Sequence, residues 1–163
     1  MEILPLTQAH RPWADQVLRR EWDGPLIVSK GRLLDGSRLP GFVALEQGEP
    51  TGLILYDVRG DQCEVAALIS YQEGRGVGGA LINRVAQSAR QMGCRRLWLI
   101  TTNDNLHAIR FYQRRGFTLA AVDCGAINRY RETLKPGIPI LGSEGIPIRD
   151  EFEFERLLEQ QPG

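Results

Sequence analysis

The pattern of apolar and polar positions divides the chain into short strands and helices. After a short first strand over residues 2–6, apolar residues that recur every four positions predict a helix over residues 12–22. Alternating positions then predict a hairpin with strands over residues 42–46 and 51–58, and a third strand over residues 63–70. After the first helix, residues 25–29 form a compact apolar piece. The following residues, through Gly41, are rich in Gly, Asp and Ser, so we expect a loop there and no second full helix.

The second half of the chain continues with elements of both kinds. The expected elements are a buried strand over residues 95–101, a helix over residues 105–115, a closing pair of strands over residues 117–122 and 126–133, and a last helix beginning at Asp150. The evidence for the last helix is the capping-box spacing of Asp150 and Glu153, with apolar residues at helical spacing behind them. Residues 135–149 are rich in Pro, Gly and Ile, which predicts an ordered loop.

A glycine-rich turn joins the strand over residues 63–70 to a strong helical pattern. Four glycines let the backbone adopt positive φ and let a ligand approach it closely: Gly74, Gly76, Gly78 and Gly79. Behind the turn, apolar residues recur at helical spacing: Leu81, Val85, Ala89 and Met92. The turn therefore aims unpaired amides and the positive end of a helix at one point. This arrangement favours an anion, most naturally a pyrophosphate.

The same turn also matches the dinucleotide fingerprint G-x-G-x-x-G. A dinucleotide-binding domain would place an acidic residue about twenty residues further on. Here the nearest candidate, Asp104, lies about thirty residues after Gly74, and an antiparallel hairpin precedes the turn. The dinucleotide interpretation is therefore disfavoured, whereas a purely structural glycine turn remains an alternative.

A second motif follows the strand over residues 95–101 and changes the interpretation. It reads Asn105-Leu-His-Ala108-Ile-Arg-Phe111-Tyr112, and it closes with Gly116-Phe117. Together with Glu73-Gly-Arg75-Gly76-Val-Gly78, it resembles the GNAT superfamily of acyl-CoA-dependent N-acetyltransferases, whose order of elements is also similar from Glu2 to about Thr133. One position departs from the family pattern. Glu73 stands where the family has Gln or Arg, so phosphate binding would rest on backbone amides and Arg75.

The resemblance implies a mixed α/β (α+β) fold with a largely antiparallel sheet, which is flanked by helices and split at the acyl-CoA cleft. Acetyl-CoA would be the cosubstrate, and no metal would be needed. The residues that the resemblance assigns to acetyl-CoA are the pantetheine-binding backbone of Ala66, Ala67 and Leu68, the pyrophosphate turn of Gly74, Arg75, Gly76, Val77, Gly78 and Gly79, and the side chain of Asn105. Asn105 also has a second physical role, as the cap of its helix.

Two residues are candidates for the chemistry. Tyr112 would donate a proton to the departing CoA thiolate, with Phe111 in a buried position beside it. The alternative is an aromatic core residue whose hydroxyl binds any buried partner. Glu64, at the head of the strand over residues 63–70, is the candidate general base, and an exposed strand-end glutamate is the alternative. We expect His107 to be exposed.

The expected activity is direct transfer of an acetyl group from acetyl-CoA to an amine of a small molecule or peptide. An alternative of another class is an acyl-CoA-binding regulatory module that performs no transfer. Tyr112 favours the enzyme, because a protein that only binds acyl-CoA has no use for an acid above the thiol.

Composition limits the partners and the location. The formal net charge is zero, which gives no broad attraction to nucleic acid or anionic membranes. No apolar run approaches the ~18 residues that a membrane-spanning helix needs. Three cysteines without paired spacing, Cys63, Cys94 and Cys124, predict reduced and buried thiols in a cytoplasmic protein. We expect one domain over residues 1–134, with residues 135–163 packed on it as a loop and helix or placed at a homodimer contact.

Overall fold

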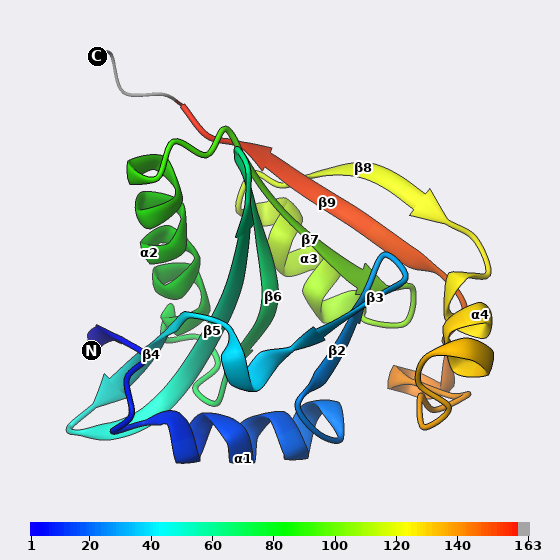
Figure 1. The fold of residues 1–163 in the computed structure, drawn as a ribbon, viewed down its shortest axis with the longest axis horizontal. Helices are drawn as coiled ribbons and strands as arrows, with labels where there is room; N and C mark the ends of the chain where they lie inside the picture. Colours follow the sequence, from blue (N-terminus) through cyan, green and yellow to red (C-terminus); the bar gives the residue numbers. More distant parts are fainter. Residues whose placement is uncertain (160–163) are drawn as a thin grey trace. The chain divides into compact units, whose positions relative to one another are not determined.

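The structure is a computed structural model that describes residues 1–159 of the 163-residue chain (Figure 1). These residues form two compact units. The first unit contains residues 1–27, 35–97 and 157–159; the second contains residues 28–34 and 98–156.

Antiparallel strands form the sheet of the first unit, in the order β1-β4-β5-β6. Their bounds are β1 Glu2–Pro5, β4 Gly41–Glu46, β5 Glu49–Arg59 and β6 Gln62–Ser70. The same unit holds α1 Arg11–Trp22, the short 3-10 helix η1 Gly36–Arg38 and α2 Val77–Gln91. α2 packs on β4, β5 and β6, because the apolar stripe expected behind the glycine turn is buried over most of its length.

The second unit contains three further strands, in the order β7-β9-β8. Their bounds are β7 Arg96–Thr102, which begins in the first unit, β8 Thr118–Asp123 and β9 Glu151–Leu157. Its helices are α3 Leu106–Arg114, α4 Ala126–Thr133 and the short 3-10 helix η2 Ser143–Gly145. The tip of a two-stranded hairpin, β2 Leu26–Ser29 with β3 Arg32–Asp35, also belongs to this unit.

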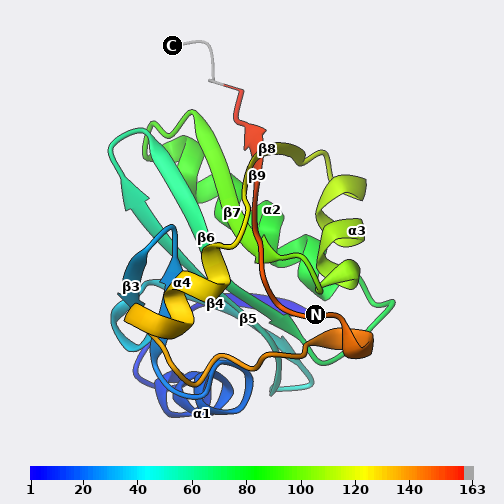
Figure 2. The same ribbon diagram turned by 90° about the vertical axis from the view of Figure 1, so that its right-hand side faces the viewer.

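A small core forms where α4 packs against the hairpin and against the loop that follows α4, two segments that Figure 2 shows beside this helix. Ala126, Ile127 and Tyr130 are buried, and they share one face of α4 because they are spaced at helical intervals. Partly buried apolar residues pack against them: Val28, Leu134, Ile138 and Ile148.

The expectation of a mixed α/β fold with a largely antiparallel sheet flanked by helices is confirmed. Three local predictions are wrong. Residues 126–133 form the helix α4 and not a strand, because their apolar positions line one helix face. Residues 151–157 form the strand β9 and not a helix, because they pair with β8 from Asp123↔Glu151 to Thr118↔Glu155. Residues 32–35, expected to lie in a loop, form the strand β3, which pairs with β2.

The Pro/Gly-rich segment over residues 135–149 is an ordered loop apart from η2, as expected. Arg131 donates hydrogen bonds to the carbonyls of Ile138, Pro139 and Ile148 at 2.8–3.1 Å. The side-chain oxygen of Asn103 accepts hydrogen bonds from the amides of residues 149 and 150. These contacts hold the segment on the second unit, whereas residues 160–163 lie outside the described part of the chain. The boundary at residue 134 stays a prediction.

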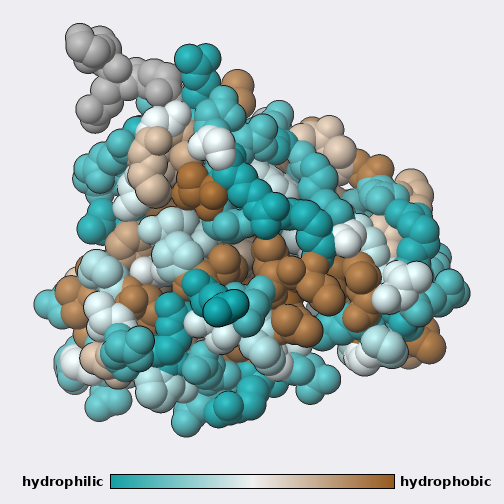
Figure 3. Space-filling model, viewed as in Figure 1, coloured by the Kyte–Doolittle hydropathy of each residue, from teal (hydrophilic) through white to brown (hydrophobic). Residues whose placement is uncertain are grey.

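The three cysteines differ in their exposure. Cys63 and Cys94 are buried free thiols, but Cys124 is exposed, so the expectation of three buried thiols is wrong for Cys124. Large apolar side chains also reach the surface, including Ile140 and Leu141 in the loop, and Figure 3 shows such hydrophobic residues on one face. Within residues 1–159, no helix combines the length and the apolar character that crossing a membrane demands.

Candidate active site

The glycine turn between β6 and α2 has the conformation that its sequence predicts. Gly74 and Gly76 have φ values of 74° and 75°, in the left-handed region that favours glycine. Gly76 is also the N-cap of α2, and it offers no side chain to the helix amides. A Cβ built on either glycine would meet no atom of residues 1–159 within 4 Å, so the space above the turn is open to a ligand as far as these residues are concerned.

The first amides of α2 are available to an anion. The first helical hydrogen bond runs from the amide of Ala80 to the carbonyl of Gly76 at 3.0 Å. Among the described residues, no acceptor is found for the amides of residues 77–79. These amides carry the positive end of the helix dipole, so the turn suits a phosphate group.

Two charged side chains flank this turn. Arg75 lies with its Nη1 3.2 Å from Oε1 of Glu46, in an ion pair whose arginine is 64% exposed. Such an exposed pair contributes about 0–1 kcal/mol, so a phosphate would compete for Arg75 at little cost. Glu73 is also exposed.

β6 contains an irregularity at the position expected to bind pantetheine. Leu55 pairs with Ala67 and the next residue of β5, Tyr56, pairs with Val65. Ala66 is therefore the extra residue of a β-bulge, which bends the strand and interrupts its hydrogen-bond ladder. Residues 66–68 lie at or just after this bulge, and bulges of this kind frequently lie beside active sites. The sequence pattern gave no sign of the bulge.

Glu64 occupies an unexpected environment. It pairs with Asp57 of β5 near the beginning of β6, yet only 2% of its surface is exposed. The alternative of an exposed strand-end glutamate is therefore wrong. Glu64 stays a candidate for proton transfer by its position, because it lies in the strand that carries the bulge at Ala66.

Asn105 caps α3, as one of its two expected roles requires. Its side-chain oxygen accepts a hydrogen bond from the amide of Ala108 at 3.1 Å. The residue is exposed. The second role, hydrogen bonding to the cofactor, stays a prediction.

Tyr112 lies on α3 and is 8% exposed. Its ring packs edge-on against Phe111 and Phe117, with centroid distances of 5.2 Å and 5.4 Å. Burial raises the pKa of the Tyr112 hydroxyl above its ordinary value of 10, and the charge of Arg115 lowers it in part. Within residues 1–159 the hydroxyl forms no hydrogen bond, so its proton is available for donation. Phe111, expected to be the buried member of the pair, is only half-buried, and His107 is exposed as expected.

The structure distributes the predicted residues over both units. The first unit carries the glycine turn, the bulge over residues 66–68 and Glu64, all on β6 or immediately after it. The second unit carries Asn105 and Tyr112, at the beginning and near the end of α3. The separation of β6 from β7 that the resemblance implies stays a prediction.

Comparison with known proteins identifies the family. The family model described as the acetyltransferase (GNAT) family matches residues 5–117. The chain belongs to the GNAT acetyltransferase family. The glycine turn, the bulge, Glu64, Asn105 and Tyr112 all lie within the matched residues of this GNAT protein.

Individual relatives support this assignment. The uncharacterized protein YdhI of Bacillus subtilis (strain 168) is 38% identical over 160 residues, which cover 98% of this chain and 99% of YdhI. The streptothricin acetyltransferase of Streptomyces lavendulae is 42% identical over 50 residues, which cover 31% of this chain and 26% of that protein. A GNAT family acetyltransferase from Elizabethkingia anophelis, solved with acetyl-CoA bound, has a TM-score of 0.69 at 16% identity, over 96% of this chain and 97% of that one.

Proposed function

We propose that this protein transfers an acetyl group from acetyl-CoA directly to the amine of a small molecule or peptide. The observation that carries the proposal is the turn over residues 74–79, whose open space and unpartnered amides fit a pyrophosphate in a member of an acetyltransferase family. The Elizabethkingia protein of the same fold holds acetyl-CoA, and the related streptothricin acetyltransferase supports acetyl transfer in general.

Two backbone segments of the first unit would hold acetyl-CoA. The amides of residues 77–79 would bind the pyrophosphate, with Arg75 released from Glu46 to add its charge. Backbone groups at residues 66–68, where the bulge interrupts the ladder of β6, would pair with the amides of pantetheine. Asn105, which is exposed, would add a hydrogen bond from its side-chain NH2 group.

The reaction then needs one base and one acid. Glu64 accepts a proton from the ammonium group of the acceptor, because only the neutral amine has a lone pair to attack the thioester carbon. The C–N bond forms and the C–S bond breaks, and Tyr112 gives its proton to the leaving sulfur. The nitrogen loses its second proton as it becomes an amide, and uptake of one proton restores the Tyr112 hydroxyl. The raised pKa of Tyr112 keeps this acid protonated at neutral pH. One backbone N–H at the bulge would stabilise the negative charge that develops on the thioester oxygen.

The test is release of the CoA thiol from acetyl-CoA in the presence of a panel of amines, measured with a thiol reagent. We expect release that depends on both the protein and an amine, with an acetylated amine of matching amount detected by mass spectrometry. Calorimetric binding of acetyl-CoA without release for any amine would instead support a regulatory module that only binds acyl-CoA.

Location and assembly are part of the same proposal. Free thiols at all three cysteines suit the reducing cytoplasm. A homodimer is expected from the exposed apolar residues of the loop, and light scattering of the full chain tests it.

A further inference from the structure

The segment between β7 and α3 also holds a distant part of the chain. Asn103 and Asp104 lie between Thr102, the last residue of β7, and Asn105, the N-cap of α3. Both side chains bind the loop over residues 135–149 or the residue that follows it, 39–47 residues further along the chain. Residues 102–105, the junction of β7 and α3, are therefore the place where this loop is fastened.

Asn103 uses both ends of its side-chain amide on this segment. Its Oδ1 accepts hydrogen bonds from the amides of Arg149 and Asp150 at 2.9 Å and 3.0 Å, so both lone pairs of the oxygen are used. Its Nδ2 donates a hydrogen bond to the carbonyl of Pro147 at 2.9 Å. The backbone amide of Asn103 also donates to the carbonyl of Asp150 at 3.1 Å. Asn103 thus fixes the end of the loop through its side chain and its backbone.

Asp104 holds the middle of the loop from a buried position. Its carboxylate accepts hydrogen bonds from the amide of Ser143 at 3.0 Å and from the hydroxyl of Thr102. Only 6% of the Asp104 surface is exposed. Gly142 approaches so closely that a Cβ built on it would collide with the carboxylate of Asp104. The loop therefore packs tightly on the junction in addition to its hydrogen bonds.

α3 is short, so its position depends on its two ends. It contains nine residues, of which only Tyr112 is buried. Isolated helices shorter than about 12–15 residues are marginal in water. The amide of Asn105 donates to the carbonyl of Thr102 at 3.1 Å. The amide of Leu106 donates to the carbonyl of Asp104 at 2.9 Å. The first turn of α3 is thus bound to residues that the loop holds in place.

β9 holds the other end of the helix. Nη1 of Arg156 donates a hydrogen bond to the carbonyl of Arg115, the C-cap residue, at 3.1 Å. The same guanidinium lies 5.2 Å from the ring centroid of Phe117, which packs edge-on against Tyr112. Because the loop and β9 follow one another in the chain, one continuous segment contacts the junction before α3 and the end of α3.

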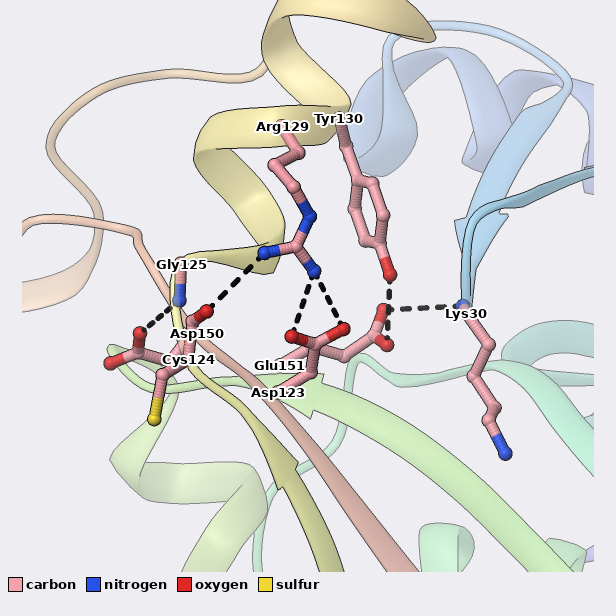
Figure 4. Close-up of polar contacts among 8 residues, drawn as sticks. All are labelled: Lys30, Asp123, Cys124, Gly125, Arg129, Tyr130, Asp150 and Glu151. Atoms are coloured by element: carbon pink, nitrogen blue, oxygen red, sulfur yellow. Dashed lines mark hydrogen bonds and ion pairs between the residues drawn. The ribbon is translucent and has the colours of Figure 1, made fainter.

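The beginning of β9 has support of its own from α4. Oδ1 of Asp150 accepts a hydrogen bond from the amide of Gly125, the N-cap of α4, at 2.8 Å (Figure 4). The next residue, Glu151, accepts one from the Tyr130 hydroxyl at 3.1 Å. Burial raises the pKa of Tyr130 to about 12, so this hydroxyl stays a donor at neutral pH. Asn103 is therefore bound to a segment that α4 also holds, and it connects α3 to a fixed point.

We propose that Asn103 is a positioning residue for the acetyl transfer. It fixes the beginning of α3 against the loop, and it thereby sets the positions of Asn105 and Tyr112. This inference rests on the proposed function, in which Asn105 binds the cofactor and Tyr112 is the acid. Asn103 acts through the helix, because its side-chain oxygen and NH2 group are bound to the loop segment. A displacement of about 1 Å at the reacting groups is enough to slow a reaction about 10²-fold.

The hold on α3 is tested first without chemistry, by hydrogen exchange of the full chain measured with NMR. The amides of Ala108 and Ile109 report the first turn, because they donate to the side chain and the carbonyl of Asn105. The amide of Phe117, which donates to the carbonyl of Tyr112, is the internal reference at the other end. Replacement of Asn103 by Ala should speed exchange at the two first-turn amides about tenfold relative to this reference. An equal change at all three amides would overturn the inference.

Thiol release then measures the positioning. With an amine that supports release, Asn103→Ala should lower kcat about 10- to 100-fold. The KM for the amine should change less than about twofold, because the groups that react are displaced and the amine loses no contact. Asn103→Asp keeps the oxygen that accepts from the two loop amides, so its kcat should lie only about two- to threefold below that of the parent. Tyr130→Phe is the matched control. It removes one buried hydrogen bond of the same unit, so the unfolding midpoint should fall while kcat stays that of the parent.

The outcomes separate this inference from the proposed function. Amine-dependent release with the same kcat in the parent and Asn103→Ala proteins would leave the acetyltransferase standing and overturn the positioning role. A loss of kcat that Tyr130→Phe shares and Asn103→Asp does not recover would trace the effect to stability, and it would overturn the role as well. If Asn103→Ala does not fold, Asn103→Asp decides alone, and parental kcat with parental exchange would count against the role. Absence of release from the parent with every amine would overturn the proposed function, and the positioning role with it.

Discussion

Gly52 of β5 lies directly against Val77, the first residue of α2. A Cβ built on Gly52 would lie 2.7 Å from Cγ1 of Val77 and 3.1 Å from Cδ1 of Leu81. Because Gly52 has no side chain, the beginning of α2 packs closely on β5. Gly52 also pairs with Ser70, the last residue of β6. The contact with Val77 sets how closely the beginning of α2 packs on β5.

Gly52→Ala should consequently affect stability and cofactor binding together. The extra methyl group must push α2 outward, at a cost of about 1–3 kcal/mol for overpacking. Displacement of the amides of residues 77–79 should weaken acetyl-CoA binding as well. Denaturant unfolding and calorimetry measure the two effects, and unchanged affinity in a destabilised protein would separate the packing of Gly52 from the phosphate site.

The open space above Gly76 leads to a sharper test of the phosphate site. Gly76→Ala should abolish detectable acetyl-CoA binding, because its methyl group enters the space that the pyrophosphate needs. Positive φ at a non-glycine residue also costs about 1–2 kcal/mol of stability. Gly93→Ala is the matched control, since Gly93 also has positive φ (83°) and open space around it, at the other end of α2. Equal loss of affinity in both variants would trace the effect to strain.

Arg75 and Glu46 form a pair whose two members should behave differently. Arg75→Ala should weaken acetyl-CoA binding by about 1–3 kcal/mol, the scale of a hydrogen bond to a charged group. Glu46→Ala frees Arg75 from its ion pair, so binding should stay the same or become slightly tighter. Calorimetry with acetyl-CoA and with pantetheine compares the two variants. If Arg75→Ala weakens pantetheine binding equally, the arginine supports the fold and not the phosphate.

Tyr112→Phe should lower kcat about 10²–10⁴-fold with acetyl-CoA affinity nearly unchanged, because a positioned acid acts in the transition state. The hydroxyl forms no hydrogen bond within the described residues, so its removal should leave the unfolding midpoint unchanged. Its pKa is raised, so the protonated form persists above pH 10 and the parent enzyme should lose no activity through Tyr112 ionisation below that pH. Full activity of the Phe variant would exclude Tyr112 as the acid.

Glu64→Gln should remove the base, so that kcat/KM depends on the fraction of the acceptor amine that is neutral. Without Glu64 only the neutral fraction of the amine reacts, so kcat/KM should fall about 10²-fold at neutral pH. It should then recover as the pH rises toward the ordinary pKa of an alkylamine, about 10. A pH profile of thiol release for both proteins measures this. Identical profiles would assign proton removal to water or to another side chain.

Local sequence determined the parts of the site whose geometry is set by single residues. Glycine is the residue that adopts positive φ at low cost, so the turn through Gly74 and Gly76 was predictable. The apolar stripe of α2 and the side-chain cap of Asn105 depend on residues three or four positions apart, and both were found correctly. The motifs that indicate the GNAT family lie in these same local segments.

Distant contacts decided the remaining elements. The helix predicted from Asp150 rested on the capping-box spacing of Asp150 and Glu153, but residues 151–155 alternate between Glu and Phe, a period of two that is typical of a strand. Pairing with β8 makes the segment a strand, and local spacing carries no information about that partner. Residues 126–133 suit either structure by composition, and burial of one face against Val28 and Ile148 selects the helix. Both errors have the same physical cause, since a partner far away in the sequence selects between two locally acceptable conformations.

The chemistry follows the same division. The sequence by itself determined which residues are candidates, because Tyr112 lies in a motif and Glu64 is a carboxylate at the head of a predicted strand. Only the tertiary structure decided that Glu64 is buried, that Ala66 is bulged out of the ladder of β6, and that Lys30 forms an ion pair with Glu153. Burial, strand register and ion pairing depend on which segments pack together, and the free energy of that packing is summed over the whole fold.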